Sequence, residues 1–230
     1  MALNKEVFKT RALTAVIFAV VMLGGLFING YTFLALFSII MIGCLYEFAK
    51  IIKIIKPTGY RIYLSLALPY IIMPIIMLIG LGIDLSKNDI DIKKYSPLIP
   101  CAIIFSIWIN DTMQYIVGSL IGKTPFSKIS PKKTWEGTIG GAVLCIVVMG
   151  LLGYFLPVAQ SLAVKHWVAI AAICAVFGTL GDLLESKIKR LAGIKDSGSF
   201  MPGHGGFLDR FDSLLVAAPF VWLYVQVFVV

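Results

Sequence analysis

Long apolar segments separated by short polar connections make up most of the chain. Each segment has about 17–25 residues, the length of a helix that crosses the hydrocarbon core of a bilayer. Apolar residues follow one another without alternation, which argues against a membrane-spanning β-barrel. We therefore predict an all-α, polytopic transmembrane helical bundle of about seven spans. The spans are expected at residues 12–28, 31–52, 62–83, 98–121, 139–156, 167–184 and 214–230.

The composition agrees with this fold class. Hydrophobic residues make up 59% of the 230 residues, charged residues make up 14%, and the mean hydropathy is +0.94. These values are typical of an integral membrane protein. We expect one membrane domain overall, with N-terminal helices in residues 1–96 and catalytic helices with their motif loops in residues 97–230. Pro69 and Pro74 fall inside one span, which predicts a kinked helix there.

Lysine and arginine residues gather in alternate connections between the spans. They lie before the first span, after the second, and before the fifth and the seventh. By the positive-inside rule, the N-terminus and the basic loops are expected in the cytoplasm, and the protein in the inner, cytoplasmic membrane. Basic residues before the first apolar segment resemble a signal peptide, but the second segment follows at once, so we expect a retained first span.

The formal net charge of +8 is therefore expected to face anionic lipid headgroups and cytosolic nucleotides. The bilayer itself is one expected partner. We find no nucleic-acid motif, so no nucleic-acid partner is expected.

One polar stretch between two spans concentrates charge next to the membrane. It runs from residue 186 to residue 212 and reads SKIKRLAGIKDSGSFMPGHGGFLDRFD. The preceding span is expected to continue as one helix out of the membrane into this stretch. On that helix, Asp182, Ser186 and Lys189 are spaced i, i+4 and i+7 and share a face, with Glu185 beside them. Gly178 and Gly181 would allow a neighbouring backbone to approach this face.

Carboxylates and a glycine-rich turn in this stretch suggest chemistry on phosphates. The glycines around His204 would let backbone amides approach a phosphate. Mg²⁺ prefers oxygen ligands and usually takes one or two carboxylates together with substrate phosphates. Asp182 and Asp209 fit that need if the bundle brings them together, and Asp212 is a candidate ligand for a second metal ion.

Two further elements lie upstream. Asn110 and Asp111 occur deep in an apolar segment, where a carboxylate is costly and is a candidate functional group. A structural partner for a buried cation is the alternative. After this segment comes ISPKKTWEG, a weak signal alone, whose donors suit phosphate oxygens. These donors are Ser130, Lys132, Lys133 and Thr134.

The stretch SKIKR, then KD, then PGHGGFLDRFD resembles the signature of the CDP-diacylglycerol synthase family, also called phosphatidate cytidylyltransferases. NDTMQYIVG and SPKKTWEG resemble two other elements of that family, so the resemblance covers about the second half of the chain. It implies transfer of a cytidylyl group from CTP to phosphatidic acid, giving CDP-diacylglycerol and pyrophosphate, in a membrane enzyme that needs Mg²⁺. A homodimer is expected only by family analogy.

Carried over by position, the resemblance makes Asp182 and Asp209 metal-binding carboxylates and gives Lys189 a role in activity. These three are our candidate catalytic residues, and Asp182, Asp209 and Asp212 are our candidate metal ligands. We expect His204 to shape its turn or donate to phosphate rather than to transfer a proton. The candidate substrate-binding residues are Asp111, Ser130, Lys132, Lys133, Thr134, Ser186, Arg190, Lys195, Asp196, His204, Gly205, Gly206 and Arg210.

Two other functions compete with this hypothesis. A CTP-dependent lipid kinase of the polyprenol or phytol type would use similar groups on a similar substrate. A small cation transporter could use buried aspartates along an ion path, but it would leave the glycine-rich turn and the lysines without a role.

Overall fold

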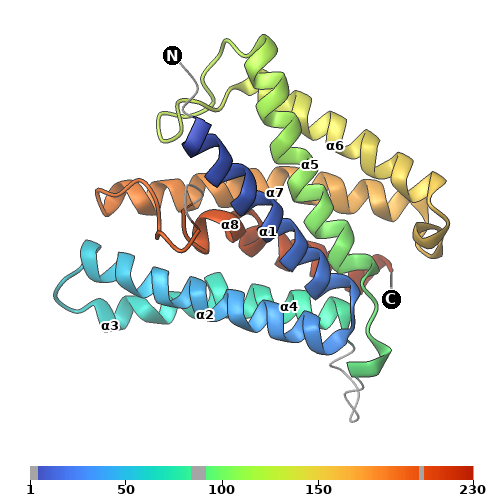
Figure 1. The fold of residues 1–230 in the computed structure, drawn as a ribbon, viewed down its shortest axis with the longest axis horizontal. Helices are drawn as coiled ribbons and strands as arrows, with labels where there is room; N and C mark the ends of the chain where they lie inside the picture. The colour runs from blue at the N-terminus through green and yellow to red at the C-terminus, as the bar shows by residue number, and fades with distance from the viewer. Residues whose placement is uncertain (1–4, 84–91, 202–204, 230) are drawn as a thin grey trace. The chain divides into compact units, whose positions relative to one another are not determined.

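Helices account for most of the computed structural model, which describes residues 5–83, 92–201 and 205–229 (Figure 1). The side chains of residues 5–11 are not described. Within the described ranges the chain forms no strand, and each of the seven predicted spans falls on a helical segment. The main helices are α1 (Lys5–Phe27), α2 (Gly30–Ile55), α3 (Tyr60–Tyr63), α4 (Met73–Gly82), α5 (Leu98–Ile121), α6 (Trp135–Phe155), α7 (Val164–Leu191) and α8 (Leu208–Phe228).

Five helical segments in the described part of the chain are long and apolar enough to cross a membrane. They are α2, the segment Tyr60–Gly82, α6, α7 and α8. The described apolar part of α1, Ala12–Phe27, is shorter. Helix α5 has 24 residues, but Asn110, Asp111 and Gln114 lower its hydropathy. The prediction of a polytopic helical membrane bundle is confirmed.

The third predicted span is interrupted, as its two prolines suggested. After α3, the chain passes through the 3₁₀ turn Leu64–Leu66 and the π-helical segment Leu68–Ile72 before α4 begins. Pro69 lies in the π-helical segment and Pro74 in the first turn of α4. A proline lacks the N–H that continues an α-helical ladder, so the regular helix is broken here.

Several helices extend beyond the apolar segments that predicted them. Helix α7 continues through the charged residues to Leu191, as expected. Helix α6 begins at Trp135 rather than at residue 139, because the Thr134 side chain accepts the Gly137 N–H and caps it. Helix α8 begins at Leu208 rather than at residue 214. Apolarity marks the membrane-embedded part of a helix, whereas caps and backbone hydrogen bonds decide where the helix begins.

The chain divides into two compact units. The first contains Met1–Pro97 and Ile188–Phe211, and the second contains Leu98–Lys187 and Asp212–Val230. In the first unit, α1 packs along α2, and Asn29 caps α2 by accepting the Thr32 N–H at 2.9 Å. Its core is apolar and aromatic, with Phe33, Phe37, Ile40 and Cys44 of α2 buried.

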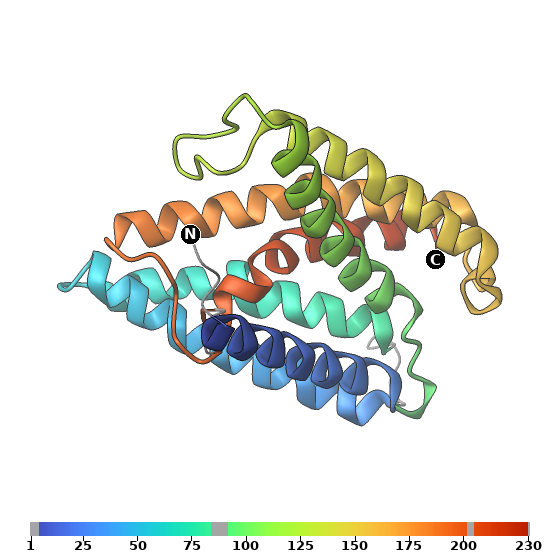
Figure 2. The same cartoon turned by 45° about the horizontal axis from the view of Figure 1, so that its top comes forward.

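The second unit is built on two close helix pairs. Helices α5 and α6 lie side by side in both views (Figures 1 and 2). Glycines allow this approach: a Cβ on Gly137 would lie 2.9 Å from the Gly118 Cα, and a Cβ on Gly141 would lie 2.8 Å from the Gln114 Cα. Across the other pair, α7 and α8, the rings of Phe177 and Phe220 stack. This second pair carries the acidic residues described next.

Candidate functional site

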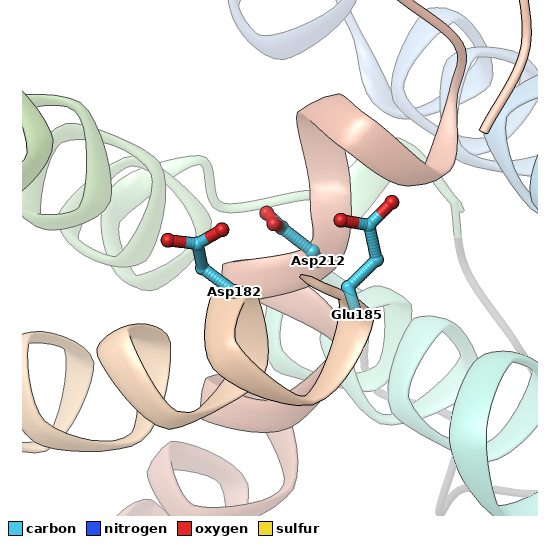
Figure 3. Close-up of side chains that lie close together, drawn as sticks. All are labelled: Asp182, Glu185 and Asp212. Atoms are coloured by element: carbon cyan, nitrogen blue, oxygen red, sulfur yellow. The ribbon is translucent and has the colours of Figure 1, made fainter. Parts of the chain in front are cut away.

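Three carboxylates lie together in the second unit (Figure 3). Asp182 and Glu185 project from α7, and Asp212 projects from α8. One ligand oxygen from each lies within 4.8 Å of the others. Asp182 is partly exposed, whereas Glu185 is 2% and Asp212 is 8% exposed. We call these three residues the carboxylate cluster.

Glycine packing between α7 and α8 produces the cluster. Asp182 and Glu185 are three residues apart and therefore share a face of α7. A Cβ on Gly181 would lie 3.1 Å from the Asp212 carbonyl carbon, so only glycine lets the α8 backbone approach this closely. The Ser213 N–H donates to Asp212 Oδ1 at 2.7 Å and fixes that side chain. The close packing at Gly181 thus places the third carboxylate beside the first two.

This arrangement gives a prediction about Gly181. Replacing Gly181 with Ala forces α7 and α8 apart, so we expect destabilisation by about 1–3 kcal/mol, as for other overpacked sites. If the carboxylate cluster holds Mg²⁺, any thermal stabilisation by Mg²⁺ should also fall, because Asp212 moves away from α7. The measurement is a thermal unfolding curve with and without Mg²⁺. Gly24→Ala is the matched control, since a Cβ there meets only Ile28 Cδ1 at 3.7 Å.

A basic loop contributes a cation to the cluster. Lys133 Nζ forms an ion pair with Asp182 Oδ2. The loop is ordered by its own hydrogen bonds: the Phe126 N–H donates to the Lys133 carbonyl, and the Trp135 N–H donates to the Thr124 carbonyl. Glu136 also accepts the N–H groups of Lys123 and Thr124. The predicted phosphate-binding loop therefore lies beside the predicted metal ligand Asp182.

The electrostatics of the cluster favour a bound cation. Like charges this close repel, and burial of Glu185 and Asp212 removes the water that would screen them. A hard divalent cation takes oxygen ligands, and all three groups of the cluster supply oxygen.

A second polar group lies in the first unit. Lys189 Nζ donates to Asp209 Oδ1 at 2.6 Å, and both side chains are largely buried. Asp209 Oδ2 accepts the N–H groups of Ser197 and Gly206 at 2.9 and 2.8 Å. Ser197 Oγ also lies 2.7 Å from Oε2 of Glu47 on α2. We call Glu47, Lys189, Ser197 and Asp209 the signature network.

The structure brings some predicted residues together and leaves one pairing untested. Asp182, Asp212 and Lys133 meet in the second unit, and Lys189 and Asp209 meet in the first. Asp182 and Asp209 belong to different units, so a metal ion shared by these two residues stays a prediction.

The other predicted substrate-binding residues stay predictions as well. His204 lies outside the described residues. Thr134 caps α6, and the Gly206 N–H donates to Asp209. Gly205 has φ +83 and closes a turn by accepting the Met201 N–H. The exposed residues are Asp111, Lys132, Arg190, Lys195, Asp196 and Arg210; Ser130, Thr134 and Gly205 are half-buried; and Ser186 and Gly206 are buried.

Three residues of these two groups were absent from the sequence-based candidates: Glu47, Glu185 and Ser197. Glu185 was placed on the correct helix face but was not chosen as a ligand. Glu47 was missed entirely, although a lone carboxylate in the apolar segment 31–52 is itself a signal of a functional or structural site.

Known proteins resemble this chain over its second half and more. Residues 71–228 match the model of the cytidylyltransferase family. Phosphatidate cytidylyltransferase 4, chloroplastic, of Arabidopsis thaliana is 46% identical over 117 residues, which are 51% of this chain and 29% of the relative. The phosphatidate cytidylyltransferase of Bacillus subtilis (strain 168) is 44% identical over 124 residues, 53% of this chain and 45% of the relative. That of Staphylococcus aureus (strain COL) is 42% identical over 116 residues, 49% of this chain and 43% of the relative.

The chain thus spans between 29% and 45% of the length of these curated relatives. The matched family region begins in the third predicted span and ends in α8. It includes the basic loop, the carboxylate cluster and every member of the signature network except Glu47. The resemblance noted in the sequence is confirmed, and the chain belongs to the cytidylyltransferase family.

Proposed function

We propose that this multi-pass membrane protein transfers a cytidylyl group from CTP to phosphatidic acid, forming CDP-diacylglycerol and pyrophosphate. The observation that carries the proposal is the carboxylate cluster with Lys133 beside it. It puts carboxylate oxygens suited to a divalent cation next to a lysine suited to bind phosphate. The names of the relatives supply the substrates, and family membership supplies the reaction class.

Magnesium suits the cluster chemically. Its three carboxylates offer oxygen atoms only, they lie within 4.8 Å of one another, and two of them are buried. We propose that Asp182, Glu185 and Asp212 hold the ion. When bound, Mg²⁺ offsets the charge of CTP phosphates and of the departing pyrophosphate. Asp209 as a further ligand, and a second metal ion, stay predictions from the sequence.

The reaction needs little help from a base. A phosphomonoester such as phosphatidate already carries a charged oxygen near pH 7, since its second pKa is about 6. That oxygen forms a bond to the α-phosphorus of CTP, and the bond from this phosphorus to the bridging β-phosphate oxygen breaks. Positive side chains bring the two anions together, and Lys132, Lys133, Lys189 and Arg190 are proposed for this task.

The substrates are expected to arrive by different routes. With the N-terminus in the cytoplasm, the basic loop and the signature stretch face the cytosol, from which CTP enters. Phosphatidic acid would enter sideways from the bilayer, leaving its acyl chains in lipid. The proposed location is the inner, cytoplasmic membrane, and a homodimer is proposed by family analogy alone.

Labelled CTP tests the reaction. Purified protein in detergent with phosphatidate and Mg²⁺ should transfer ³²P to lipid from the α-position of CTP and release pyrophosphate. Label arriving from the γ-position would instead indicate a lipid kinase. Ion flux into proteoliposomes without nucleotide, combined with no transfer from either position, would indicate a transporter.

Lys133 provides a second test of the site. Because Lys133 pairs with Asp182, its ammonium competes with a metal ion for that carboxylate. For Lys133→Met we expect divalent-ion affinity without CTP to rise several-fold and the KM for CTP to rise by about 10-fold, an effect of about 1.4 kcal/mol. Isothermal titration and steady-state kinetics measure the two effects. Lys128→Met is the control, because Lys128 is an exposed lysine of the same loop. Unchanged values for both quantities would contradict this role.

A further inference from the structure

The carboxylate of a buried glutamate on α2 lies at the N-terminal end of α8. Glu47 lies within the candidate span α2, and its side chain is buried, with the residue only 4% exposed. Its Oε1 accepts the Phe207 N–H at 3.0 Å, and its Oε2 accepts the Leu208 N–H at 2.9 Å. The first N–H groups of a helix have no partner within the helix, and they favour a negative group. Glu47 therefore serves as a cap supplied by a distant helix.

The polypeptide before α8 is shaped around this carboxylate. A Cβ on Gly206 would lie 2.5 Å from the Glu47 Cδ, and a Cβ on Gly198 would lie 2.8 Å from it. One turn earlier on α2, a Cβ on Gly43 would lie 2.5 Å from the ring of Phe207. Glycine at these three positions thus lets Gly198 and Gly206 lie against Glu47 and lets Phe207 lie against α2.

The glutamate is connected to two candidate catalytic residues. Ser197 Oγ lies 2.7 Å from Glu47 Oε2 and 2.9 Å from Asp209 Oδ2. Asp209 in turn accepts a hydrogen bond from Lys189 at 2.6 Å. Glu47 thus connects α2 to the last turn of α7 and the first turn of α8 through three consecutive polar contacts.

We propose that Glu47 is a positioning residue for the signature stretch, an inference that rests on the proposed cytidylyl transfer. Its carboxylate fixes the first turn of α8 and, through Ser197, the places of Asp209 and Lys189. This role needs no contact between Glu47 and the substrates. Misplacement of reacting groups by about 1 Å can cost about 100-fold in rate, so loss of this anchor affects turnover even without loss of the fold.

Glu47→Gln tests the proposal with little change in shape. The amide keeps one acceptor oxygen but turns its NH₂ donor toward the N–H of either Phe207 or Leu208. We expect kcat to fall by about 10- to 100-fold, with the KM for CTP changed by less than about threefold. Hydrogen exchange followed by mass spectrometry should show faster exchange in the peptide containing residues 206–208. Glu47→Asp keeps the charge and should recover part of kcat.

Two other variants complete the design. Gly198→Ala pushes the loop away from an intact Glu47 and should reproduce the lower kcat and the faster exchange, which covers the case in which Glu47→Gln does not fold. Asn29→Ala is the matched control, since Asn29 caps the N-terminal end of α2, the helix that carries Glu47, and shows whether a general weakening of α2 alone lowers kcat. It should keep wild-type kcat.

Each outcome bears on one claim. A wild-type protein that transfers no cytidylyl group refutes the proposed function, whereas the exchange experiment still reports on the anchor. If the wild type is active, three results would overturn the role of Glu47. The first is a kcat within twofold of wild type in folded Glu47→Gln and Gly198→Ala. The second is a lower kcat in these variants with unchanged exchange at residues 206–208. The third is an equal loss of kcat in Asn29→Ala.

Discussion

Replacing Asp182 with Asn should lower the rate of CDP-diacylglycerol formation by about 1000-fold, which corresponds to about 4 kcal/mol of transition-state stabilisation. Asp182 is the member of the carboxylate cluster that also contacts the basic loop through Lys133. The variant keeps the size of the side chain and removes the charge that would hold a cation. Activity is measured as pyrophosphate release from CTP and phosphatidate.

Folding should survive this change. Asp182 is partly exposed, and its ion pair with Lys133 is partly exposed as well, so losing that pair costs little stability. Neutralising Asp182 also relieves repulsion from Glu185 and Asp212, so the unfolding temperature without Mg²⁺ should be equal to or above that of the wild type. A variant that folds normally and keeps more than a tenth of the wild-type rate would show that Asp182 is not part of the reaction centre.

Replacing Lys189 with Met should produce the second largest effect. Lys189 and Asp209 have side chains that are 11% and 6% exposed. Removing one partner of a buried pair leaves an uncompensated charge, which typically costs about 3–5 kcal/mol of stability. We also expect at least about a 100-fold lower rate, because Lys189 is a proposed phosphate-binding cation. Thermal unfolding and initial rates in the same preparation measure both effects.

The double variant Lys189→Met/Asp209→Asn separates stability from catalysis. With both charges removed, the Asn side chain can still accept the Gly206 N–H, so most of the lost stability should return. The rate should stay low, since the phosphate-binding cation is still missing. Recovery of activity together with stability would mean that Lys189 has only a structural role.

The sequence was sufficient for the membrane fold because apolar length reports directly on bilayer thickness. The apolar segments located the helices, and Pro69 and Pro74 located the break in the third span. It was less informative about helix ends. The beginning of α6 depends on the Thr134 cap, and that of α8 on a glutamate from another part of the chain.

Prediction of the site was partial for the same reason. Helical spacing put Asp182 and Glu185 on one face of a helix, and Gly181 suggested that another backbone approaches that face closely. The sequence did not say which residue approaches it. That residue is Asp212, and the packing of α7 on α8 was needed to identify it. Glu47 could not be connected to Ser197 from the sequence, because the two residues are 150 positions apart and α2 shows only a lone carboxylate among apolar residues.

The central claim is that Asp182, Glu185 and Asp212 form a divalent-cation site, and Mn²⁺ binding followed by electron paramagnetic resonance tests it most directly. The purified wild-type protein should bind Mn²⁺, and Mg²⁺ should displace it. Affinity should fall by at least about 10-fold in Asp182→Asn and in Asp212→Asn. Asp209→Asn, measured alongside, decides whether that residue is also a ligand. Unchanged Mn²⁺ affinity in both Asp182→Asn and Asp212→Asn would contradict the claim.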